Sequence, residues 1–313
     1  MNGDGAARRL GWVGAGRMGL ALAGRLLAAG HELSVYNRTR AKAEPLAEQG
    51  ATIVDSPADL SGCDVVFTIL AGDDDFKQVV KEVLAAERPP AIIVDITTVS
   101  PEASAEVRAA AQERGTALLA APVSGNPKVA KAGRLTIVVS GPEDAYREAE
   151  PLLERLAAGV TYVGDGENAR LAKICHNLML GVVSQCLAEI VVLAEKGGMS
   201  RAAFLEFLNN SVMGSTFTRY KSPAYVNLDF TPTFTPLLLR KDFDLGLAAA
   251  RELDVPMAVA AATQQAIQAL IGQGYTDTDF AALLEMQARN SDLELEPEAV
   301  EVPDGLSDAP VAA

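Results

Sequence analysis

The feature that most constrains the fold is a glycine-rich loop near the beginning of the chain. An apolar run over residues 10–13 leads into GAGRMG, which is followed at once by a helix-forming stretch. In this spacing Gly14 permits a tight turn, Gly16 lets the backbone approach a pyrophosphate, and Gly19 allows a helix to pack closely on a strand. The N-terminus of that helix adds N–H donors for an anion. The sequence therefore predicts a dinucleotide-binding loop, with Ala15, Arg17 and Met18 as its intervening residues.

Apolar runs and amphipathic segments alternate through the first half of the chain. Runs such as VVFTIL and AIIVDIT have the character of strands, whereas residues 101–113 and 142–156 have the character of helices. This alternation predicts an α/β fold in which a doubly wound, mostly parallel sheet forms a dinucleotide-binding Rossmann domain over residues 9–165.

The second half of the chain has a different pattern. After Gly166 only helical periodicity remains, over residues 168–196, 200–209, 237–253 and 257–270. We therefore expect an all-α domain over residues 166–291, which a long helix joins to the first domain.

Charge is distributed unevenly along the chain. The net charge is −14, and residues 292–313 contain acidic residues and prolines without one lysine or arginine. We expect this tail to be solvated and disordered. A chain this acidic is repelled by nucleic acid and by anionic membranes, so we expect neither as a partner.

The cysteines and the chain start indicate the compartment. Cys63, Cys175 and Cys186 are odd in number and lack the spacing of metal ligands, which favours reduced thiols, a cytoplasmic protein and no metal site. The N-terminus has no apolar leader segment, and polar residues interrupt the apolar stretch over residues 171–195. We therefore expect neither secretion nor a membrane span.

The end of the second predicted strand, LSVYNRTR, indicates which dinucleotide binds. An NAD site usually places an acidic residue here to accept a hydrogen bond from the ribose 2′-OH, whereas this chain has Asn37, Arg38 and Thr39. Arg38 can offer its planar guanidinium to a 2′-phosphate, and Asn37 and Thr39 can donate hydrogen bonds. We therefore expect NADP(H) as the preferred cofactor and NAD(H) as the alternative.

Two further segments carry residues suited to chemistry. APVSG ends a predicted strand at the edge where doubly wound sheets bind ligands, so the Ser124 hydroxyl and adjacent N–H groups could hold a carboxylate. Lys173 and Asn177 are four residues apart and share one face of the long helix. A lysine among apolar residues suits proton transfer to or from a substrate oxygen. An ordinary turn, and a lysine that extends to solvent from a core helix, remain the alternatives.

These motifs, in this order, resemble the β-hydroxyacid dehydrogenase family, which includes 3-hydroxyisobutyrate dehydrogenase, tartronate semialdehyde reductase and glyoxylate/succinic semialdehyde reductases. The resemblance runs from Leu10 to Ala288 and rests on GAGRMG, DITTVSP, APVSG, GxG followed by LAKxxxN, and RKDFDL. It implies an oxidoreductase that transfers hydride between NADP(H) and a small carboxylated aldehyde or 3-hydroxy acid. It also implies a homodimer or homotetramer formed through the helical domain.

The resemblance also implies residue roles. Lys173 falls on the family's catalytic lysine, the general acid in aldehyde reduction and the general base in alcohol oxidation. Asn177 falls on the asparagine that orients the substrate, and Ser124 and Gly125, followed by Asn126, fall on the carboxylate-binding loop. The other implied positions are Leu70, Thr98 and Lys241 for the cofactor, and Phe234 and Asp242 for the substrate.

Two departures from the family pattern leave alternatives open. Family members commonly have glycine where this chain has Asn126 and asparagine where it has His176. Asn126 leaves the size and head group of the substrate open, and His176 is a candidate second proton-transfer group. Two other functions also remain open. One is an imine reductase, which usually carries Asp or Tyr in place of Lys173, and the other is a catalytically silent nucleotide-binding module.

Overall fold

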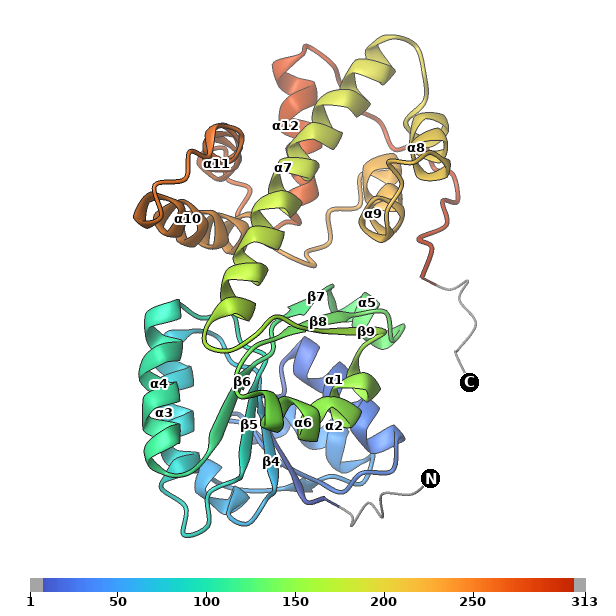
Figure 1. The fold of residues 1–313 in the computed structure, drawn as a ribbon. Coiled ribbons are helices and arrows are strands. Elements are labelled where there is room, and N and C mark those ends of the chain that lie inside the picture. The colour runs from blue at the N-terminus through green and yellow to red at the C-terminus, as the bar shows by residue number, and fades with distance from the viewer. Residues whose placement is uncertain (1–7, 307–313) are drawn as a thin grey trace. The chain divides into compact units, whose positions relative to one another are not determined.

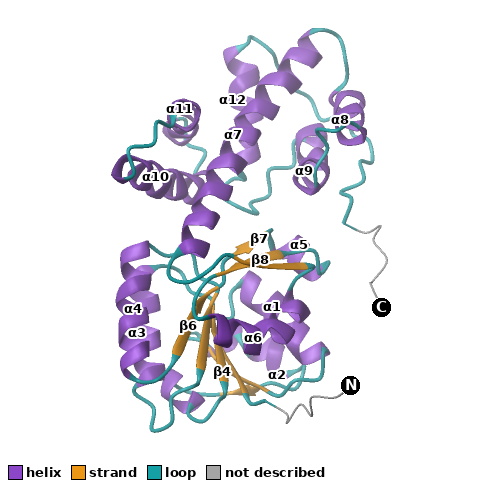
Figure 2. Ribbon diagram, in the orientation of Figure 1, coloured by secondary structure: helices purple, strands orange, loops and turns teal. Residues whose placement is uncertain are grey.

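The chain is divided into two compact units, which the computed structural model describes over residues 8–306 (Figures 1 and 2). The first unit ends at Lys173 and the helical unit begins at Ile174. The division falls inside helix α7 (Asn168–Lys196), whereas the sequence places the boundary between residues 165 and 166. The first turn of α7 therefore belongs to the first unit.

A six-stranded parallel sheet forms the centre of the first unit, as the alternating pattern predicts. Its strands follow the order β3-β2-β1-β4-β5-β6. Strands β1, β4 and β5 are buried along their whole length, which is typical of a parallel sheet covered on both faces. The order reverses between β1 and β4, where ligands of such folds bind. The strand bounds are β1 (Leu10–Val13), β2 (Leu33–Tyr36), β3 (Thr52–Ile53), β4 (Val65–Thr68), β5 (Ile92–Asp95) and β6 (Ala117–Ala120).

Helices cover both faces of this sheet (Figure 1). Helices α3 (Asp73–Leu84) and α4 (Pro101–Glu113) lie on one face, and α1 (Arg17–Ala28), α2 (Glu44–Ala47) and α6 (Glu143–Leu156) lie on the other. On the first of these faces Phe76 and Val80 of α3 pack against strand residues such as Val66 and Ile93. Two short 3₁₀ helices, η1 (Arg40–Lys42) and η2 (Pro57–Leu60), complete the connections.

The last three strands of the first unit form a second, smaller sheet instead of extending the parallel one. Its order is β7-β8-β9, and β7 is antiparallel to β8. The cause is the reversal of the chain after β6, which leads into β7 and the short helix α5 before β8. The bounds are β7 (Val123–Ser124), α5 (Pro127–Lys131), β8 (Thr136–Val139) and β9 (Gly159–Tyr162).

The helical unit contains the rest of α7 and the helices that pack around it. Helix α7 is the one described helix that is long and apolar enough to cross a membrane, with a mean hydropathy of 1.8. It packs as a core helix, because Ile174, Leu178, Leu187 and Val191 lie in the hydrophobic clusters of this unit. The remaining helices are α8 (Arg201–Asn210), α9 (Thr216–Asn227), α10 (Pro236–Glu252), α11 (Ala258–Gly272), η3 (Phe280–Ala282) and α12 (Leu283–Asn290).

A buried ion pair joins α9 to the segment before η3. Lys221 is 3% exposed and Asp279 is 1% exposed, and the lysine Nζ donates to the carboxylate. Burial alone would raise the pKa of Asp279, but the charge of Lys221 and hydrogen bonds from Lys221, Thr233 and Ala281 hold that pKa below its usual value. The pair therefore fixes two segments far apart in the sequence.

The acidic tail is ordered as far as it is described, contrary to the expectation from its composition. The backbone N–H groups of Arg201 and Ala202 donate to the Glu298 carboxylate, and Arg201 Nη2 donates to the Glu296 carbonyl. Arg201 is fully buried, so the tail supplies part of its hydrogen-bonding shell. Leu293, Leu295 and Val302 pack on the core of the helical unit. Residues 307–313 lie outside the described part of the chain.

Candidate cofactor and active site

The three glycines of the glycine-rich loop have different surroundings in the structure. Gly14 has φ +106°, and a Cβ there would lie 2.1 Å from the Ile69 carbonyl oxygen. A Cβ on Gly19 would lie 2.1 Å from the Gly14 carbonyl oxygen. A Cβ on Gly16 would meet no described atom within 4 Å. The fold therefore requires glycine at 14 and 19, whereas the open side of Gly16 fits a pyrophosphate that approaches the backbone.

Helix α1 begins directly at this loop. Gly16 is its N-cap residue, and no side chain from residues 8–306 caps it. The first N–H groups of a helix have no intrahelical acceptor, and together with the helix dipole they attract an anion. The indole Nε1 of Trp12 donates to the Gly14 carbonyl at 2.8 Å and fixes the turn that precedes the helix.

The turn after β2 connects to the glycine loop. Asn37 Oδ1 accepts from the Ala15 N–H at 2.8 Å, and Asn37 Nδ2 donates to the Thr39 carbonyl at 2.8 Å. The Asn37 amide thus connects the glycine loop to the turn after β2. The Arg38 side chain is 80% exposed, and its Nη1 lies 2.9 Å from Oδ1 of Asp75 in the first turn of α3.

Leu70 and Thr98 follow the carboxyl ends of neighbouring strands β4 and β5. Both are half-buried. The Leu70 N–H donates to Thr97 Oγ1 at 3.0 Å, which ties the two loops together. The first unit therefore brings the glycine loop, the turn after β2 and both of these residues to the carboxyl ends of its parallel strands.

The predicted carboxylate loop is tightly built. Ser124 ends β7. Gly125 has φ +130°, and a Cβ there would lie only 2.4 Å from Leu135 Cδ2, so that position requires glycine. Asn126 is 9% exposed and is the N-cap of α5, where its Oδ1 accepts from the N–H groups of Lys128 and Val129 at 2.9 and 3.1 Å. Asn126 therefore has a structural role that its departure from the family pattern does not reveal.

In the helical unit a chain of hydrogen bonds orients Asn177. Its Nδ2 donates to Asp242 Oδ2 at 2.5 Å, and both residues are nearly buried, at 3% and 4% exposure. A carboxylate only accepts hydrogen bonds, so the amide atom that faces Asp242 is Nδ2 and the atom that faces His176 is Oδ1. His176 Nδ1 therefore donates to Asn177 Oδ1 at 2.9 Å. Asp242 thus sets the orientation of Asn177, and through it the tautomer of His176 in this contact.

Other predicted residues lie on both sides of the division at Lys173. Lys173, half-buried, is the last residue of the first unit and stands one helical turn before Asn177. Lys241 precedes Asp242 in α10, and Phe234 packs edge-on against Phe280 with ring centroids 6.0 Å apart. Within the described residues no group of His, Cys, Asp or Glu has the arrangement of a metal site.

Sequence reasoning missed three polar residues of the first unit. Asp95 ends the fully buried strand β5, Arg170 is 2% exposed in the first turn of α7, and Asp75 pairs with Arg38. A charge at the end of an otherwise apolar strand was the available signal for Asp95. The sequence does not mark Arg170 as buried, because the partners of its hydrogen bonds lie more than sixty residues away in sequence.

Comparison with known proteins gives matches along almost the whole chain. The NAD binding domain of 6-phosphogluconate dehydrogenase matches residues 9–164, and the NAD-binding domain of NADP-dependent 3-hydroxyisobutyrate dehydrogenase matches residues 166–287. A protein of Mycobacterium tuberculosis named probable 3-hydroxyisobutyrate dehydrogenase is 32% identical over 283 residues, which cover 87% of this chain and 95% of that protein. Glyoxylate/succinic semialdehyde reductase 1 of Arabidopsis thaliana is 31% identical, with coverage of 88% and 97%. The structure of M. tuberculosis 3-hydroxyisobutyrate dehydrogenase with L-serine aligns with a TM-score of 0.79 at 28% identity, and covers 89% of this chain and 98% of that one.

Proposed function

The chain belongs to the 3-hydroxyisobutyrate dehydrogenase, or β-hydroxyacid dehydrogenase, family of NAD(P)-dependent oxidoreductases, and from this premise we propose that it reduces a small carboxylated aldehyde with NADPH, or oxidises the matching 3-hydroxy acid. The observation that carries the proposal is the buried Asn177–Asp242 pair, which orients an amide one helical turn from Lys173. A lysine and an oriented amide on one helix face are suited to a carbonyl oxygen, since one supplies a proton and the other a hydrogen bond.

The first unit fits the dinucleotide. The open side of Gly16 and the uncapped start of α1 suit the pyrophosphate, and the exposed guanidinium of Arg38 suits a 2′-phosphate. When bound, NADPH supplies the hydride that reduces the carbonyl carbon. We propose NADP(H) over NAD(H) because the turn after β2 carries Arg38 in place of an acidic residue.

The chain's own residues supply binding, orientation and a proton. Lys173 Nζ donates a proton to the carbonyl oxygen during reduction and accepts it from the hydroxyl during oxidation. Asn177, held by Asp242, orients the substrate. The Ser124 hydroxyl and the N–H of Gly125 hold its carboxylate, which the rigid Gly125 turn supports.

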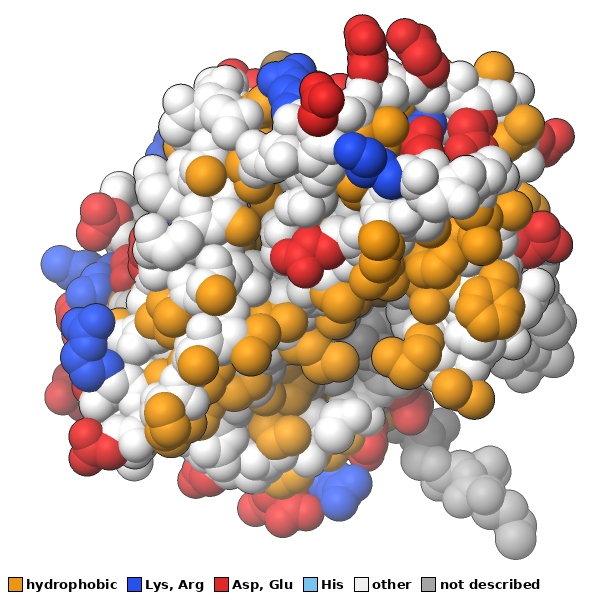
Figure 3. All heavy atoms as spheres, turned by 90° about the horizontal axis from the view of Figure 1, so that it is seen from above, with side chains coloured by type: hydrophobic (Ala, Val, Ile, Leu, Met, Phe, Trp, Pro, Cys, Tyr) orange, Lys and Arg blue, Asp and Glu red, His pale blue; other side chains and the backbone are white. Residues whose placement is uncertain are grey.

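The surface of the helical unit supports a homo-oligomer. Figure 3 shows hydrophobic side chains gathered on the face seen from above, with few charges among them. Apolar patches larger than those of ordinary monomers mark interaction sites. We propose a homodimer or homotetramer through this unit, and a cytoplasmic enzyme because the three cysteines are free thiols. In the helical unit the most exposed large hydrophobic side chains are Met179, Leu193, Phe207, Val212 and Met213.

The test is a substrate panel run in parallel with NADPH and NADH. The aldehydes are glyoxylate and the succinic, tartronate and methylmalonate semialdehydes, the hydroxy acids are 3-hydroxyisobutyrate and serine, and a cyclic imine represents the alternative activity. We expect turnover of at least one carboxylated substrate, with a higher kcat/KM for NADPH. Lys173→Ala should lower kcat by about a hundredfold or more, since it removes the proton donor.

Two outcomes would contradict the proposal. Turnover of the imine alone would identify an imine reductase, and cofactor binding without any turnover would identify a silent nucleotide-binding module. Lys173→Arg serves as the control that keeps the charge but not the proton-transfer chemistry, since arginine does not give up its proton.

A further inference from the structure

Asp95 and Arg170 form a buried ion pair that joins the first turn of α7 to the central sheet. Asp95 is fully buried at the end of β5, Arg170 is 2% exposed, and Arg170 Nη2 donates to Asp95 Oδ2 at 2.5 Å. Taking two charges out of water is unfavourable unless their remaining donors and acceptors are also bonded. The surroundings of the pair meet this condition.

Each remaining polar atom of the pair has a partner within the first unit. Asp95 Oδ1 accepts from Thr68 Oγ1 and from Thr97 Oγ1, each at 2.6 Å. Arg170 Nη1 donates to the Thr97 carbonyl, and Arg170 Nε donates to Ser104 Oγ at 3.2 Å. The network therefore fixes the guanidinium in one plane and one orientation.

Thr97 connects this network to the two loops that carry Leu70 and Thr98, the cofactor positions implied by the resemblance. Its hydroxyl accepts from the Leu70 N–H at 3.0 Å, and its carbonyl, which is bonded to Arg170, directly precedes Thr98. Leu70 and Thr98 are thus held through a single residue that contacts both members of the ion pair.

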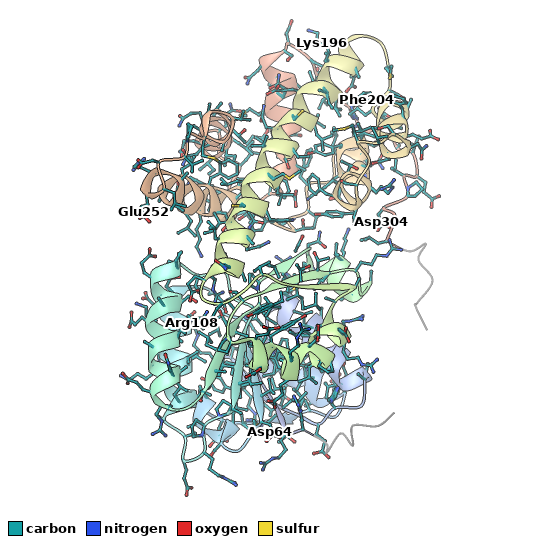
Figure 4. All side chains as sticks on the ribbon, in the orientation of Figure 1. Asp64, Arg108, Lys196, Phe204, Glu252 and Asp304 are labelled. Atoms are coloured by element: carbon teal, nitrogen blue, oxygen red, sulfur yellow. The ribbon has the colours of Figure 1, made fainter. Side chains whose placement is uncertain are left out.

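Arg170 also stands three residues before Lys173 on the same helix. Residues at this spacing are neighbours on a helix surface and differ by about 4.5 Å along its axis. A second brace holds the helix start, since Arg108 of α4 pairs with Glu167 at 2.8 Å and donates to the Gly166 carbonyl at 2.9 Å (Figure 4, where Arg108 is labelled). Lys173 therefore takes its position from the same network that holds Leu70 and Thr98.

We infer that Asp95 and Arg170 are a positioning pair, which sets Lys173 against the Leu70 and Thr98 loops so that the proton donor meets the carbonyl while hydride is transferred. The inference rests on the proposed function, because it requires Lys173 to be the proton donor. It assigns no contact with substrate to either residue. Their effect on the reaction passes through Lys173 and Thr97.

The test uses three variants of the full chain and a matched control. Arg170→Lys keeps the charge but loses the planar fork that bonds Asp95 and the Thr97 carbonyl together. Thr97→Val removes the hydroxyl that links Asp95 to Leu70, and Thr97→Ser restores it. The control is Thr116→Val. It removes another buried hydroxyl, which belongs to the residue before β6 and donates to the Pro90 carbonyl at 2.7 Å.

Five quantities are measured for each variant. They are the NADPH dissociation constant by calorimetry, the urea midpoint of unfolding, kcat and KM, and the deuterium isotope effect on kcat/KM with NADPH labelled at the transferred position. For Arg170→Lys and Thr97→Val we expect kcat to fall about tenfold or more, with the NADPH dissociation constant and KM within about threefold, because small errors in position slow the chemical step most. The isotope effect should rise in both of these variants. Thr97→Ser and Thr116→Val should match the parent protein in kcat and in the isotope effect.

A purely structural role of the Asp95–Arg170 pair would change the urea midpoint and not the kinetics. If Arg170→Lys and Thr97→Val lower the urea midpoint but leave kcat and the isotope effect unchanged, the pair is only structural and the inference is overturned. If Arg170→Lys does not fold, Thr97→Val decides alone. Failure of the proposed function is seen separately, because near-normal turnover by Lys173→Ala removes the lysine's role whatever the other variants do.

Discussion

Replacing Glu298 with glutamine tests whether the acidic tail is part of the folded helical unit. The Glu298 side chain is 18% exposed. Its oxygens accept from the backbone N–H groups of Arg201 at 2.5 Å and Ala202 at 3.1 Å, the first two residues of α8. One of them also lies 3.9 Å from Nε of the buried Arg201 guanidinium. A single carboxylate thus satisfies two helix-end donors and faces a buried charge.

The expected loss follows from these contacts. Glutamine keeps only one acceptor oxygen, so the variant loses one hydrogen bond to the start of α8, worth about 1 kcal/mol. It also loses the negative charge that strengthens the remaining contacts, worth about 1 kcal/mol more. Arg201 keeps Glu195, whose two oxygens lie 2.7 Å from Nη1, so the larger penalty of an orphaned buried charge does not arise. We expect the free energy of unfolding to fall by about 2 kcal/mol.

The assay is urea unfolding of the full chain, followed by circular dichroism at neutral pH. Glu294→Gln is the matched control, because it removes the same charge from an exposed position of the same tail. The control should change the free energy of unfolding by less than about 0.5 kcal/mol. Equal midpoints for the two variants would refute the reasoning, since Glu298 would then contribute no more than a solvated tail charge.

Three further predictions concern the cofactor loop, the cofactor turn and acid stability. Gly16→Ala should fold normally but weaken NADPH binding about tenfold or more in calorimetry. Gly19→Ala should instead lower the unfolding midpoint, because a Cβ at residue 19, unlike one at residue 16, would meet a backbone atom at 2.1 Å. Asp75→Asn should lower the NADPH dissociation constant about two- to fivefold and leave that of NADH unchanged, because it releases Arg38 from the 2.9 Å ion pair. Asp74→Asn should change neither constant, and equal effects of the two variants would contradict this prediction. Asp279 has a lowered pKa in the folded state, so its stabilisation is present above its unfolded pKa and is lost as the pH falls through the folded value. Thermal unfolding between about pH 2 and pH 5 should show this loss, and Asp279→Asn should show less of it while being about 3–5 kcal/mol less stable at pH 7.

Local patterns predicted the parts of the molecule that depend on local geometry. The glycine spacing defines a turn within a few residues, and the four-residue step from Lys173 to Asn177 defines one helix face, so both could be read directly. The buried strands were equally plain, because a parallel sheet covered on both faces needs continuous apolar runs. What remained hidden was which residues meet across long separations, such as Asn177 and Asp242, which the resemblance marks as two separate positions without pairing them.

The acidic tail and helix α9 differ from the expectations based on the sequence: the tail is ordered as far as it is described, and α9 lies outside the expected helical ranges. The acidic tail has no basic residue of its own, but its counter-charge is Arg201, 97 residues before Glu298 in the sequence. Helix α9 contains Pro223 and has no regular apolar stripe, because Lys221 is buried by pairing with Asp279 rather than by being apolar. In both cases a buried ion pair replaces the hydrophobic signal on which sequence patterns depend.

The hydrogen bond from Trp12 to the Gly14 carbonyl gives the protein a built-in optical probe. Trp12 is the chain's one tryptophan, and its indole also stacks on Phe67 at 5.4 Å between ring centroids. Tryptophan emits light in the range that reduced nicotinamide absorbs, and the emitter is bonded to the loop that would hold the dinucleotide. Occupancy of that loop should therefore quench the emission, so binding can be followed without a label and without turnover.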